Sequence, residues 1–548
     1  MTTRDEQPPT RRRLVAPRVA TAAAGLLVLV ALLAPHDFGQ LRPAGFLTLP
    51  AEALIGVAVL VALPTRAARI VAIVAGAVLG LLTVLKLLDL GFSAALARPF
   101  DPFSDWSLFG PAQEFLAESF GRAGAIAAAI AVVLLFLALP VVLAWSVLRL
   151  TRVGQGHRTG AMRTAGALGL VWIVLAAFGV HLVPGVPVAG WPAAGLAVQH
   201  ATQARADLVD QDAFERAAAV DAVRETPAEQ LLTWLRGKDV LIVFVESYGR
   251  DALENPAIAP GVDALLRTST DRLTDAGFSA RSAFMTSPTT GGASWLAHST
   301  LQSGLWIDSQ RRYHSLMASD RFTLAAGFNR AGWRTVGVMP ANNRDWPDGK
   351  LYGYDAIYDA RTLGYQGPRF SFSSIPDQYS LAQLYRRELA TPGRAPVMAE
   401  VDLVSSHAPW DPIPSLMDWS ALGDGSGIGS PETSVRDPET VYDHDPTEAQ
   451  DDYRRTLEYS LGSTLSFVET YGNDDLVVVL LGDHQPAPII TGPDAPAEVP
   501  ITVIARDPAV FDRIADWGWS PGLKPAPAAP LWPMDAFRDR FLRAFGPQ

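Results

Sequence analysis

The chain has 548 residues, of which 49% are hydrophobic and only 18% are charged. With a mean hydropathy slightly above zero, this composition indicates a membrane portion in a protein of this size. The formal net charge of −11 argues against a general nucleic-acid-binding protein, so no nucleic acid is expected as a partner. Because the sequence contains no cysteine, it excludes disulfides, Cys-ligated metal sites and a cysteine nucleophile.

Five apolar stretches in the first half of the chain have nearly the length needed to cross a bilayer. They are residues 19–35, 45–64, 70–88, 123–148 and 164–183. The first could alternatively be a cleaved signal peptide, but no small-residue cleavage pattern follows it. The sequence therefore predicts an α-helical membrane domain with five transmembrane helices.

Arginines flank these stretches on alternate sides. They fall into three groups: Arg11, Arg12, Arg13 and Arg18; Arg66 and Arg69; and Arg149, Arg152, Arg158 and Arg163. Since cytoplasmic loops carry an excess of basic residues, we expect all three groups in the cytoplasm. The sequence thus predicts a multi-pass protein of the cell membrane, with residues 1–18 as a cytoplasmic N-terminus, residues 19–184 as the membrane domain, and the rest of the chain outside.

The second half of the chain has a different pattern. Residues 185–237 are polar and helix-patterned, which favours an amphipathic linker. In residues 238–548, short β-branched runs alternate with helix-length segments, a pattern typical of an α/β domain with a mainly parallel sheet. The runs are residues 240–245, 334–339, 397–403, 476–481 and 501–505. A long segment between His407 and Asp451, rich in Gly, Ser, Pro and Asp, is typical of a loop that covers a site.

Chemically unusual residues follow three of these runs. Glu246 comes directly after the first, His407 comes shortly after the third, which ends at Asp402-Leu, and Asp483 and His484 come after the fourth. Open parallel sheets bind ligands at the carboxyl ends of their strands. Each residue alone also has an ordinary structural interpretation, as a cap, a turn former or a hydrogen-bonded histidine. Together they form a mixed oxygen and nitrogen set suited to Mn²⁺, Zn²⁺ or Mg²⁺.

A hydroxyl nucleophile is found in residues 287–304. Gly291 and Gly292 permit a tight backbone approach, and Ser294 then begins a predicted helix, whose N-terminus favours bound oxyanions. A divalent ion would lower the pKa of this hydroxyl further. The alternative is that Ser294 is only an N-cap and the glycines only a loop.

The order of these motifs along the chain resembles the alkaline phosphatase superfamily. The motifs are Phe-Val-Glu246-Ser-Tyr-Gly, the hydroxyl-bearing helix start, Ser-Ser-His407 and Gly-Asp483-His484. The resemblance is to its membrane, sulfatase-like branch, which contains lipoteichoic acid synthases and phosphoglycerol or phosphoethanolamine transferases. That branch also has five spans before an extracellular catalytic domain. The motifs cover about residues 240–506.

The resemblance implies the roles of the site residues. Glu246, Asp483 and His484 would be ligands of one divalent ion, Mn²⁺ in preference to Zn²⁺ or Mg²⁺, with the nucleophile's oxygen as a further ligand. His407 would contact the transferred group or the leaving oxygen.

Substrate contacts are implied in a further segment. Residues 341–359 resemble the substrate-contacting segment of the branch, which makes Asn343, Arg344 and Trp346 substrate-binding residues. His298, in the nucleophile segment, is placed with them.

The nucleophile itself has rivals. Lipoteichoic acid synthases use a threonine with a different following sequence, so Thr289 and Thr290 stay open as alternatives. Ser294 is favoured because it lies at the predicted helix start, and because the distance to Gly304 matches the nucleophile segment of the superfamily.

The sequence departs from the patterns of related enzymes in two respects, and both limit the reactions that are expected. A two-metal phosphatase needs a second Asp/His set with a histidine after the Asp-His pair, yet the last histidine is His484, so one ion is predicted. Sulfatases convert a residue to formylglycine, and this conversion needs a different sequence from the one around Ser294. Sulfate-ester hydrolysis is therefore disfavoured. The sequence predicts a phosphotransferase or phosphodiesterase with a membrane lipid or lipid-linked donor and an envelope glycan or lipid acceptor. The alternatives are a sulfatase, an inactive envelope scaffold and a transporter.

Overall fold

The computed structural model describes most of the chain. It covers residues 11–36, 43–96, 98–183, 186–370, 375–429, 446–492 and 495–547. Residues 1–10 of the expected cytoplasmic N-terminus, the expected domain boundary at 184–185 and residues 430–445 of the Gly/Ser/Pro/Asp-rich segment lie outside the described residues. The chain divides into two compact units: Met1–Ala94, Arg98–Asp105 and Ala123–Leu208 in the first, and Ala95–Ala97, Trp106–Arg122 and Val209–Gln548 in the second. The predicted linker at residues 185–237 stays a prediction.

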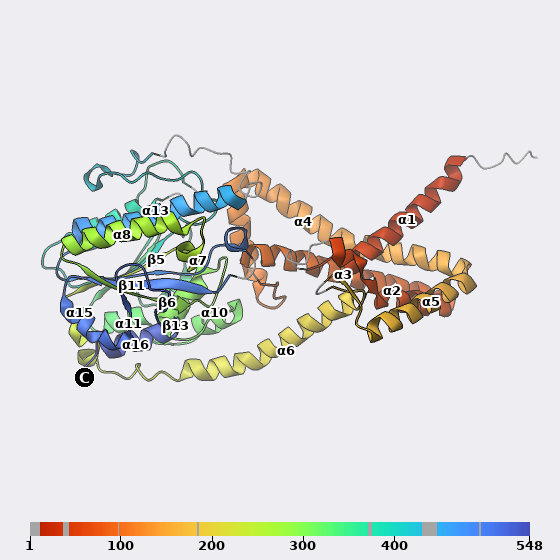
Figure 1. Ribbon diagram of the computed structural model, residues 1–548, viewed down its shortest axis with the longest axis horizontal. Coiled ribbons are helices and arrows are strands. Elements are labelled where there is room, and N and C mark those ends of the chain that lie inside the picture. Colours follow the sequence, from red (N-terminus) through yellow and green to blue (C-terminus); the bar gives the residue numbers. More distant parts are fainter. Residues whose placement is uncertain are drawn as a thin grey trace, which may run out of the picture. The chain divides into compact units, whose positions relative to one another are not determined.

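The first unit is helical. Its helices are α1 (Arg11–Leu33), α2 (Ala51–Ala62), most of α3 (Thr65–Leu96), the part of α4 (Phe109–Gly156) that begins at Ala123, α5 (Arg158–Ala177) and the first part of α6 (Pro192–Ala219), coloured red to yellow in Figure 1. Among the residues that the structure describes, three segments are long and apolar enough to cross a membrane: Thr65–Leu96, Gly121–Gly156 and Arg158–Ala177. These segments overlap the third, fourth and fifth predicted spans.

The first two predicted spans are less clear. Pro17–Leu33 and Ala51–Ala62 are apolar but shorter helices. The 12 residues of α2 rise only about 18 Å, against about 30 Å for the hydrocarbon core of a bilayer. The expected second span is divided because a 3₁₀ turn (Pro43–Leu47) and a short strand, β1 (Leu49–Pro50), precede α2. β1 pairs with β4 (Ala189–Gly190), and β2 (His181–Val183) pairs with β3 (Val186–Pro187). The count of five spans therefore stays a prediction.

The second unit is an α/β domain built on a nine-stranded sheet. In spatial order its strands are β12 (Ser520–Pro521), β6 (Ser279–Thr286), β11 (Glu498–Ala505), β10 (Leu476–Gly482), β5 (Asp239–Val245), β9 (Val397–Leu403), β7 (Arg334–Met339) and β8 (Ala356–Asp359), and β13 (Leu531–Pro533) pairs with β6. All five strands expected from the sequence are present, as β5, β7, β9, β10 and β11.

The sheet is mixed, whereas the sequence predicts a mainly parallel one. β10, β5, β9, β7 and β8 are parallel to one another, but β11 is antiparallel to both β10 and β6. A parallel return from β10 would need a crossover, usually through a full helix. The connection from β10 to β11 contains only the one-turn helix α14 (Pro488–Thr491), so β11 returns in the opposite direction.

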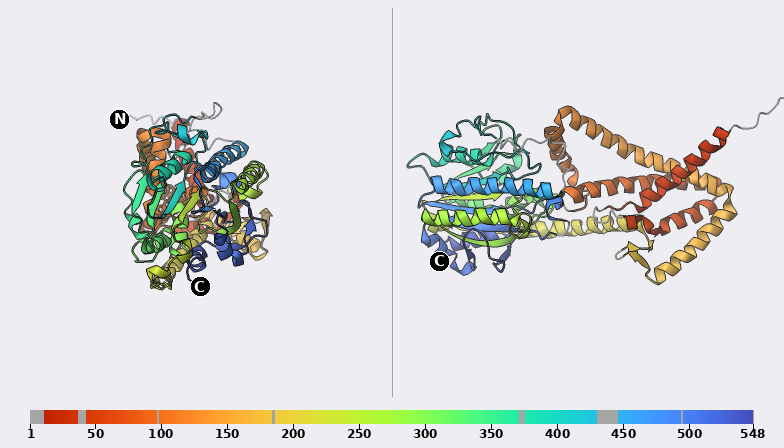
Figure 2. Two further views of the ribbon diagram at one scale, coloured as in Figure 1. Left: turned by 90° about the vertical axis from the view of Figure 1, so that its left-hand side faces the viewer. Right: turned by 45° about the horizontal axis from the view of Figure 1, so that its top comes forward.

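Helices cover both faces of this sheet (Figure 1). On one face lie α8 (Ala259–Asp275), α12 (Asp377–Leu384) and α13 (Pro446–Tyr471), and Figure 2 shows α8 and α13 side by side. On the other lie α9 (Ser294–Ser303), α11 (Leu324–Arg330) and α16 (Ala536–Ala544). The unit also contains α7 (Asp251–Glu254), α10 (Gln310–Met317) and α15 (Pro508–Arg513).

Side chains of the central strands point alternately to the two faces of the sheet, and this divides the hydrophobic core into two parts. In β5, Leu241, Val243 and Val245 pack with the α8 and α13 face, whereas Ile242 and Phe244 pack with the α9 face. All seven residues of β5 are buried, as expected for a central strand covered on both sides. The same alternation decides which side chains beyond the strand ends point toward α9.

Candidate active site

The strand directions bring the expected metal ligands to one edge and one face of the sheet. β5 and β10 are parallel neighbours, so Glu246 and Asp483 both follow carboxyl ends at the same edge. Glu246 continues the alternation of Phe244, and Asp483 continues that of Leu481, and both of these apolar residues belong to the α9 side of the core. The two carboxylates therefore project to the face where α9 lies.

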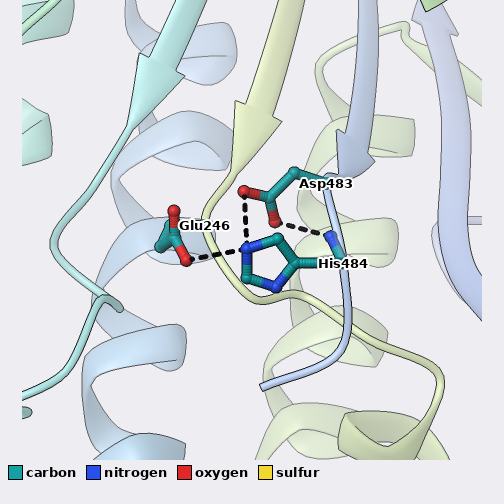
Figure 3. Close-up of side chains that lie close together, drawn as sticks. All are labelled: Glu246, Asp483 and His484. Carbon is teal, nitrogen blue, oxygen red and sulfur yellow. Dashed lines mark hydrogen bonds and ion pairs between the residues drawn. The ribbon is translucent and has the colours of Figure 1, made fainter. Parts of the chain in front are cut away.

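Figure 3 shows Glu246, Asp483 and His484 with their side chains directed toward one another. His484 Nε2 lies 3.4 Å from Glu246 Oε1 and 3.5 Å from Asp483 Oδ2. All three residues are buried, and one ligand atom from each lies within 4.8 Å of the others. This separation resembles the spacing of about 3.4 Å between neighbouring ligands of a tetrahedral ion with bonds of about 2.1 Å.

Hydrogen bonds hold each of these side chains in an orientation suited to a cation. The Nδ1–H of His484 donates to the carbonyl oxygen of Gln485 (2.8 Å), which leaves the lone pair of Nε2 facing the two carboxylates. Asp483 Oδ1 accepts from the backbone amides of Ser247 and His484, both at 2.7 Å, so that Oδ2 faces the imidazole. Ser247 also donates its hydroxyl to Glu246 Oε1 (2.7 Å). The residues therefore fit one small divalent ion.

The ionisation of the two carboxylates also favours a cation. Burial raises the pKa of Asp483 to about 6, and the negative charge of Glu246 adds to that effect. Burial acts on Glu246 in the same direction, but in the absence of an ion the positive charges that His484 and His407 carry when protonated, together with the Ser247 hydroxyl, outweigh it and hold its pKa at about 2. Two close carboxylates thus repel each other in a buried site, and a divalent ion would remove that repulsion.

Ser294 lies directly beside the three expected ligands. Its hydroxyl oxygen is 3.0 Å from Glu246 Oε2 and 3.2 Å from His484 Nε2. It is the first residue of α9, and the residue before it, Ala293, has a left-handed backbone conformation with φ of 64°. This sharp turn directs the Ser294 hydroxyl to the ligands, while the ten-residue helix presents its N-terminus to the same place.

The two threonines lie elsewhere in the same loop. Thr289 donates its hydroxyl to the carbonyl oxygen of Gly292 (2.7 Å), so its side chain supports the loop. In the part of the chain that the structure describes, no hydrogen bond joins Thr289 or Thr290 to Glu246, Asp483 or His484. The contacts of Ser294 therefore favour it over both rivals, although its role as nucleophile stays a proposal.

His407 lies at the same edge of the sheet, on the loop after β9. Its Nδ1–H donates to the carbonyl oxygen of Ala408, which makes Nε2 the proton-accepting nitrogen. Ser406 donates its hydroxyl to the Glu246 carbonyl oxygen at 2.6 Å, so this loop is attached to the strand that carries the first ligand. The buried carboxylate of Asp377 further fixes the loop by accepting the amide of Val404 at 2.8 Å.

The expected substrate-binding residues occupy two places. Asn343, Arg344 and Trp346 follow β7, at the edge where the other parallel strands end, and Asn343 and Arg344 are exposed. Trp346 is half-buried and packs on Tyr352, with ring centroids 5.3 Å apart. His298 lies one helical turn after Ser294, but its ring contacts Asp402 and Phe244. The substrate contacts of all four residues remain proposals.

Several supporting residues could not be found from the sequence. Ser247 has a left-handed backbone with φ of 57°, which is unusual for a residue other than glycine, and Tyr453 holds its carbonyl oxygen at 2.6 Å. Ser287 donates to the Asp483 carbonyl oxygen at 2.6 Å. Gly482 is required by close packing, because a Cβ there would lie 1.9 Å from the Tyr248 carbonyl oxygen. Of these supporting residues, only Gly482 could have been noticed in the sequence, because it is part of the Gly-Asp-His motif.

No protein-family model matches the sequence, and neither does any curated protein. Similar solved structures include the lipoteichoic acid synthase of Listeria monocytogenes, at 14% identity over 54% of this chain and 70% of that chain, with a TM-score of 0.32. They include the Streptococcus pyogenes phosphoglycerol transferase in complex with sn-glycerol-1-phosphate, at 12% identity over 54% and 74%, with a TM-score of 0.34. A third is the soluble domain of lipooligosaccharide phosphoethanolamine transferase A from Neisseria meningitidis, at 13% identity over 56% and 87%, with a TM-score of 0.39.

Proposed function

We propose that the chain is a metal-dependent phosphotransferase or phosphodiesterase of the cell envelope, a member of the alkaline phosphatase superfamily that works through a covalent phosphoseryl intermediate. One observation carries this proposal. The Ser294 hydroxyl lies at a helix N-terminus, 3.0 Å from Glu246 Oε2 and 3.2 Å from His484 Nε2. A hydroxyl in such a place can be ionised and used as a nucleophile.

Glu246, Asp483 and His484 would hold one divalent ion, with the Ser294 oxygen as a further ligand. We propose Mn²⁺, with Zn²⁺ and Mg²⁺ as the alternatives, because all three accept oxygen and imidazole donors. When bound, the ion supplies positive charge that lowers the pKa of the serine hydroxyl and stabilises the negative oxygens of a phosphoryl group.

The residues of the chain would then divide the reaction into two halves. In the first, Ser294 Oγ forms a bond to phosphorus as the bond from phosphorus to the leaving alcohol breaks, and the proton lost by Ser294 ends on the leaving oxygen. The N-terminal amides of α9 face the charge that develops. In the second, His407 accepts a proton from the acceptor hydroxyl or from water as that oxygen forms a bond to phosphorus. The bond from phosphorus to Ser294 Oγ breaks, and the proton passes from His407 to the Ser294 oxygen.

The donor in this proposal is a membrane lipid or lipid-linked phosphoryl alcohol, and the acceptor is an envelope glycan or lipid. The apolar helices of the first unit support a location close to such donors. Asn343, Arg344, Trp346 and His298 are proposed to contact the substrate. Sulfate-ester hydrolysis and an inactive scaffold remain the alternatives.

Mass spectrometry after substrate trapping tests the proposed function. The full chain, incubated with candidate phospholipids and quenched in acid, should give a peptide in which Ser294 carries the transferred phosphoryl group. An adduct on Thr289 or Thr290 would move the nucleophile within the same mechanism. A formylglycine mass at Ser294 would instead favour the sulfatase, and turnover without any adduct would contradict the covalent intermediate.

The proposed orientation has its own test. We propose that the membrane domain crosses the bilayer five times, with the N-terminus in the cytoplasm and the catalytic domain outside, because the three groups of arginines share one side in that arrangement. A reporter fused after Asp239 should then be active only as an external reporter, and a fusion at Arg158 only as a cytoplasmic one. The reverse pattern would exclude an envelope function.

A further inference from the structure

A second cluster of metal-ligating side chains lies on the α9 face of the sheet. Glu400 and Asp402 are alternate residues of β9, and both project to the same face as Met398, which belongs to the α9 side of the core. His298 of α9 lies between them. Its Nδ1 is 3.3 Å from Asp402 Oδ2 and 3.9 Å from Glu400 Oε1.

Hydrogen bonds hold the side chain of Glu400 in one orientation in this cluster. Its side chain is only 1% exposed, and its Oε2 accepts hydrogen bonds from the Gln302 amide and from the Tyr354 hydroxyl, the latter at 2.9 Å. The amide of Gln302 cannot turn around, because its oxygen accepts the backbone amide of Ala325 at 2.9 Å. Both contacts resemble the outer hydrogen bonds that orient carboxylates in metal sites, and they leave Glu400 Oε1 toward His298.

The negative charge of the cluster is not balanced by basic side chains. Within the described residues, no lysine or arginine lies within 4.0 Å of the carboxylate of Glu400 or Asp402, and His298 is their one cationic candidate. Two atoms are also shielded from solvent without a hydrogen-bond partner in the described part of the chain, Asp402 Oδ1 and His298 Nε2. Buried carboxylates in such surroundings need a compensating cation.

We propose that His298, Glu400 and Asp402 form a second site for a divalent cation of the Zn²⁺ or Mn²⁺ class, in which His298 is a ligand and not a substrate contact. The site offers one imidazole nitrogen and two carboxylate oxygens, the same donor set as Glu246, Asp483 and His484. The separations of 3.3 Å and 3.9 Å are close to the spacing of about 3.4 Å between neighbouring ligands of a tetrahedral ion.

A proton on His298 is the competing way to balance the charge. Burial opposes that proton, but the carboxylates of Asp402 and Glu400 raise the pKa of His298 to about 9. Burial and the charge of Asp402 also raise the pKa of Glu400 to about 7, so Glu400 is a second place where a proton can bind. A divalent ion instead neutralises both carboxylates. The ion must displace the proton when it binds, so the two states can be separated by counting ions.

This inference goes beyond the single ion that the sequence predicts. That prediction depends on the absence of a histidine after His484, while the second cluster uses His298, which precedes it in the chain. The two clusters share no ligand. If the second site does not exist, the proposed ligands of the first site therefore stay the same.

Counting bound ions tests the proposal. The full chain, purified in detergent and folded as judged by circular dichroism, is dialysed with Zn²⁺ or with Mn²⁺ and then against metal-free buffer before elemental analysis. We expect about two ions per chain in the wild type and about one in Asp402→Asn, in Glu400→Gln and in Asp483→Asn. Asp474→Asn is the matched control, because this carboxylate is 88% exposed, and it should keep two ions.

One ion in the wild type and none in Asp483→Asn would overturn the second site and leave the proposed function intact. One ion in both proteins would instead assign the ion to the second cluster and contradict the first. If the β9 variants do not fold, the thermal shift given by Zn²⁺ in Asp483→Asn decides the question. That shift should persist in Asp483→Asn and disappear when His298→Gln is added, and its absence from Asp483→Asn would contradict the proposal.

Discussion

Ser294→Ala should lower turnover by about 10⁴-fold or more, because it removes the atom that attacks phosphorus. The substitution removes only the hydroxyl group, and the alanine variant keeps Glu246, Asp483 and His484 in place. Turnover is measured as head-group release from candidate phospholipids and as cleavage of bis(p-nitrophenyl) phosphate, a small phosphodiester probe. The alanine variant should also yield no phosphoryl adduct.

The threonines of the same loop supply the controls for this prediction. Thr290→Ala should retain most of the turnover, since no hydrogen bond joins this side chain to the ligands in the described residues. Thr289→Ala should lose about tenfold at most, because its hydroxyl supports the loop through the Gly292 carbonyl oxygen. A variant Ser294→Ala with unchanged turnover, together with an inactive Thr289→Ala or Thr290→Ala, would contradict the assignment of the nucleophile.

Asp483→Asn should remove the ion of the first site, with an affinity at least about a hundredfold lower than that of the wild type. The amide has nearly the shape of the carboxylate, and its oxygen can still accept the backbone amides of Ser247 and His484. The ligand charge is lost while the local fold is kept. Titration of the metal-free protein with Mn²⁺ and Zn²⁺, followed by calorimetry, measures the change.

Ser247→Ala is the matched comparison for the metal prediction. It removes the hydroxyl that donates to Glu246 Oε1 but no ligand. A change of this kind in an outer contact is expected to weaken binding by about ten- to a hundredfold, less than the loss of a ligand. Equal affinities of Asp483→Asn and the wild type for the first ion would contradict the ligand assignment.

The central strands could be predicted from the sequence because they are buried on both faces. β5, β9 and β10 are apolar along their whole length apart from a few chemically distinct positions, so their runs are plain in the sequence. β6 could not be predicted, since Ser279 and Arg281 in its first half are not buried and interrupt the pattern. The direction of β11 depends on the connection that precedes it, which apolar runs do not reveal.

The candidate site divides in a similar way. Glu246, Asp483 and His484 could be predicted because polar residues directly after apolar runs fall at the ligand-binding edge of a sheet. Glu400 could not, because its position inside a strand gives no indication of which helix covers that face. Its partner His298 becomes its neighbour only when α9 packs there. The signal in the sequence was the pair of carboxylates in the otherwise apolar run of residues 397–403.

The proposed ligands of the first site are far apart in the sequence of the α/β domain, since Glu246 follows its first strand and His484 follows β10, almost half of the sequence later. No shorter part of the chain contains the complete set, so the ion can be acquired only after β10 has joined β5. Metal binding of this kind is coupled to folding. With the orientation proposed above, a domain that is exported before it folds would take its ion from the metal supply outside the cell membrane, and the cytoplasmic supply would have no influence on which ion is bound.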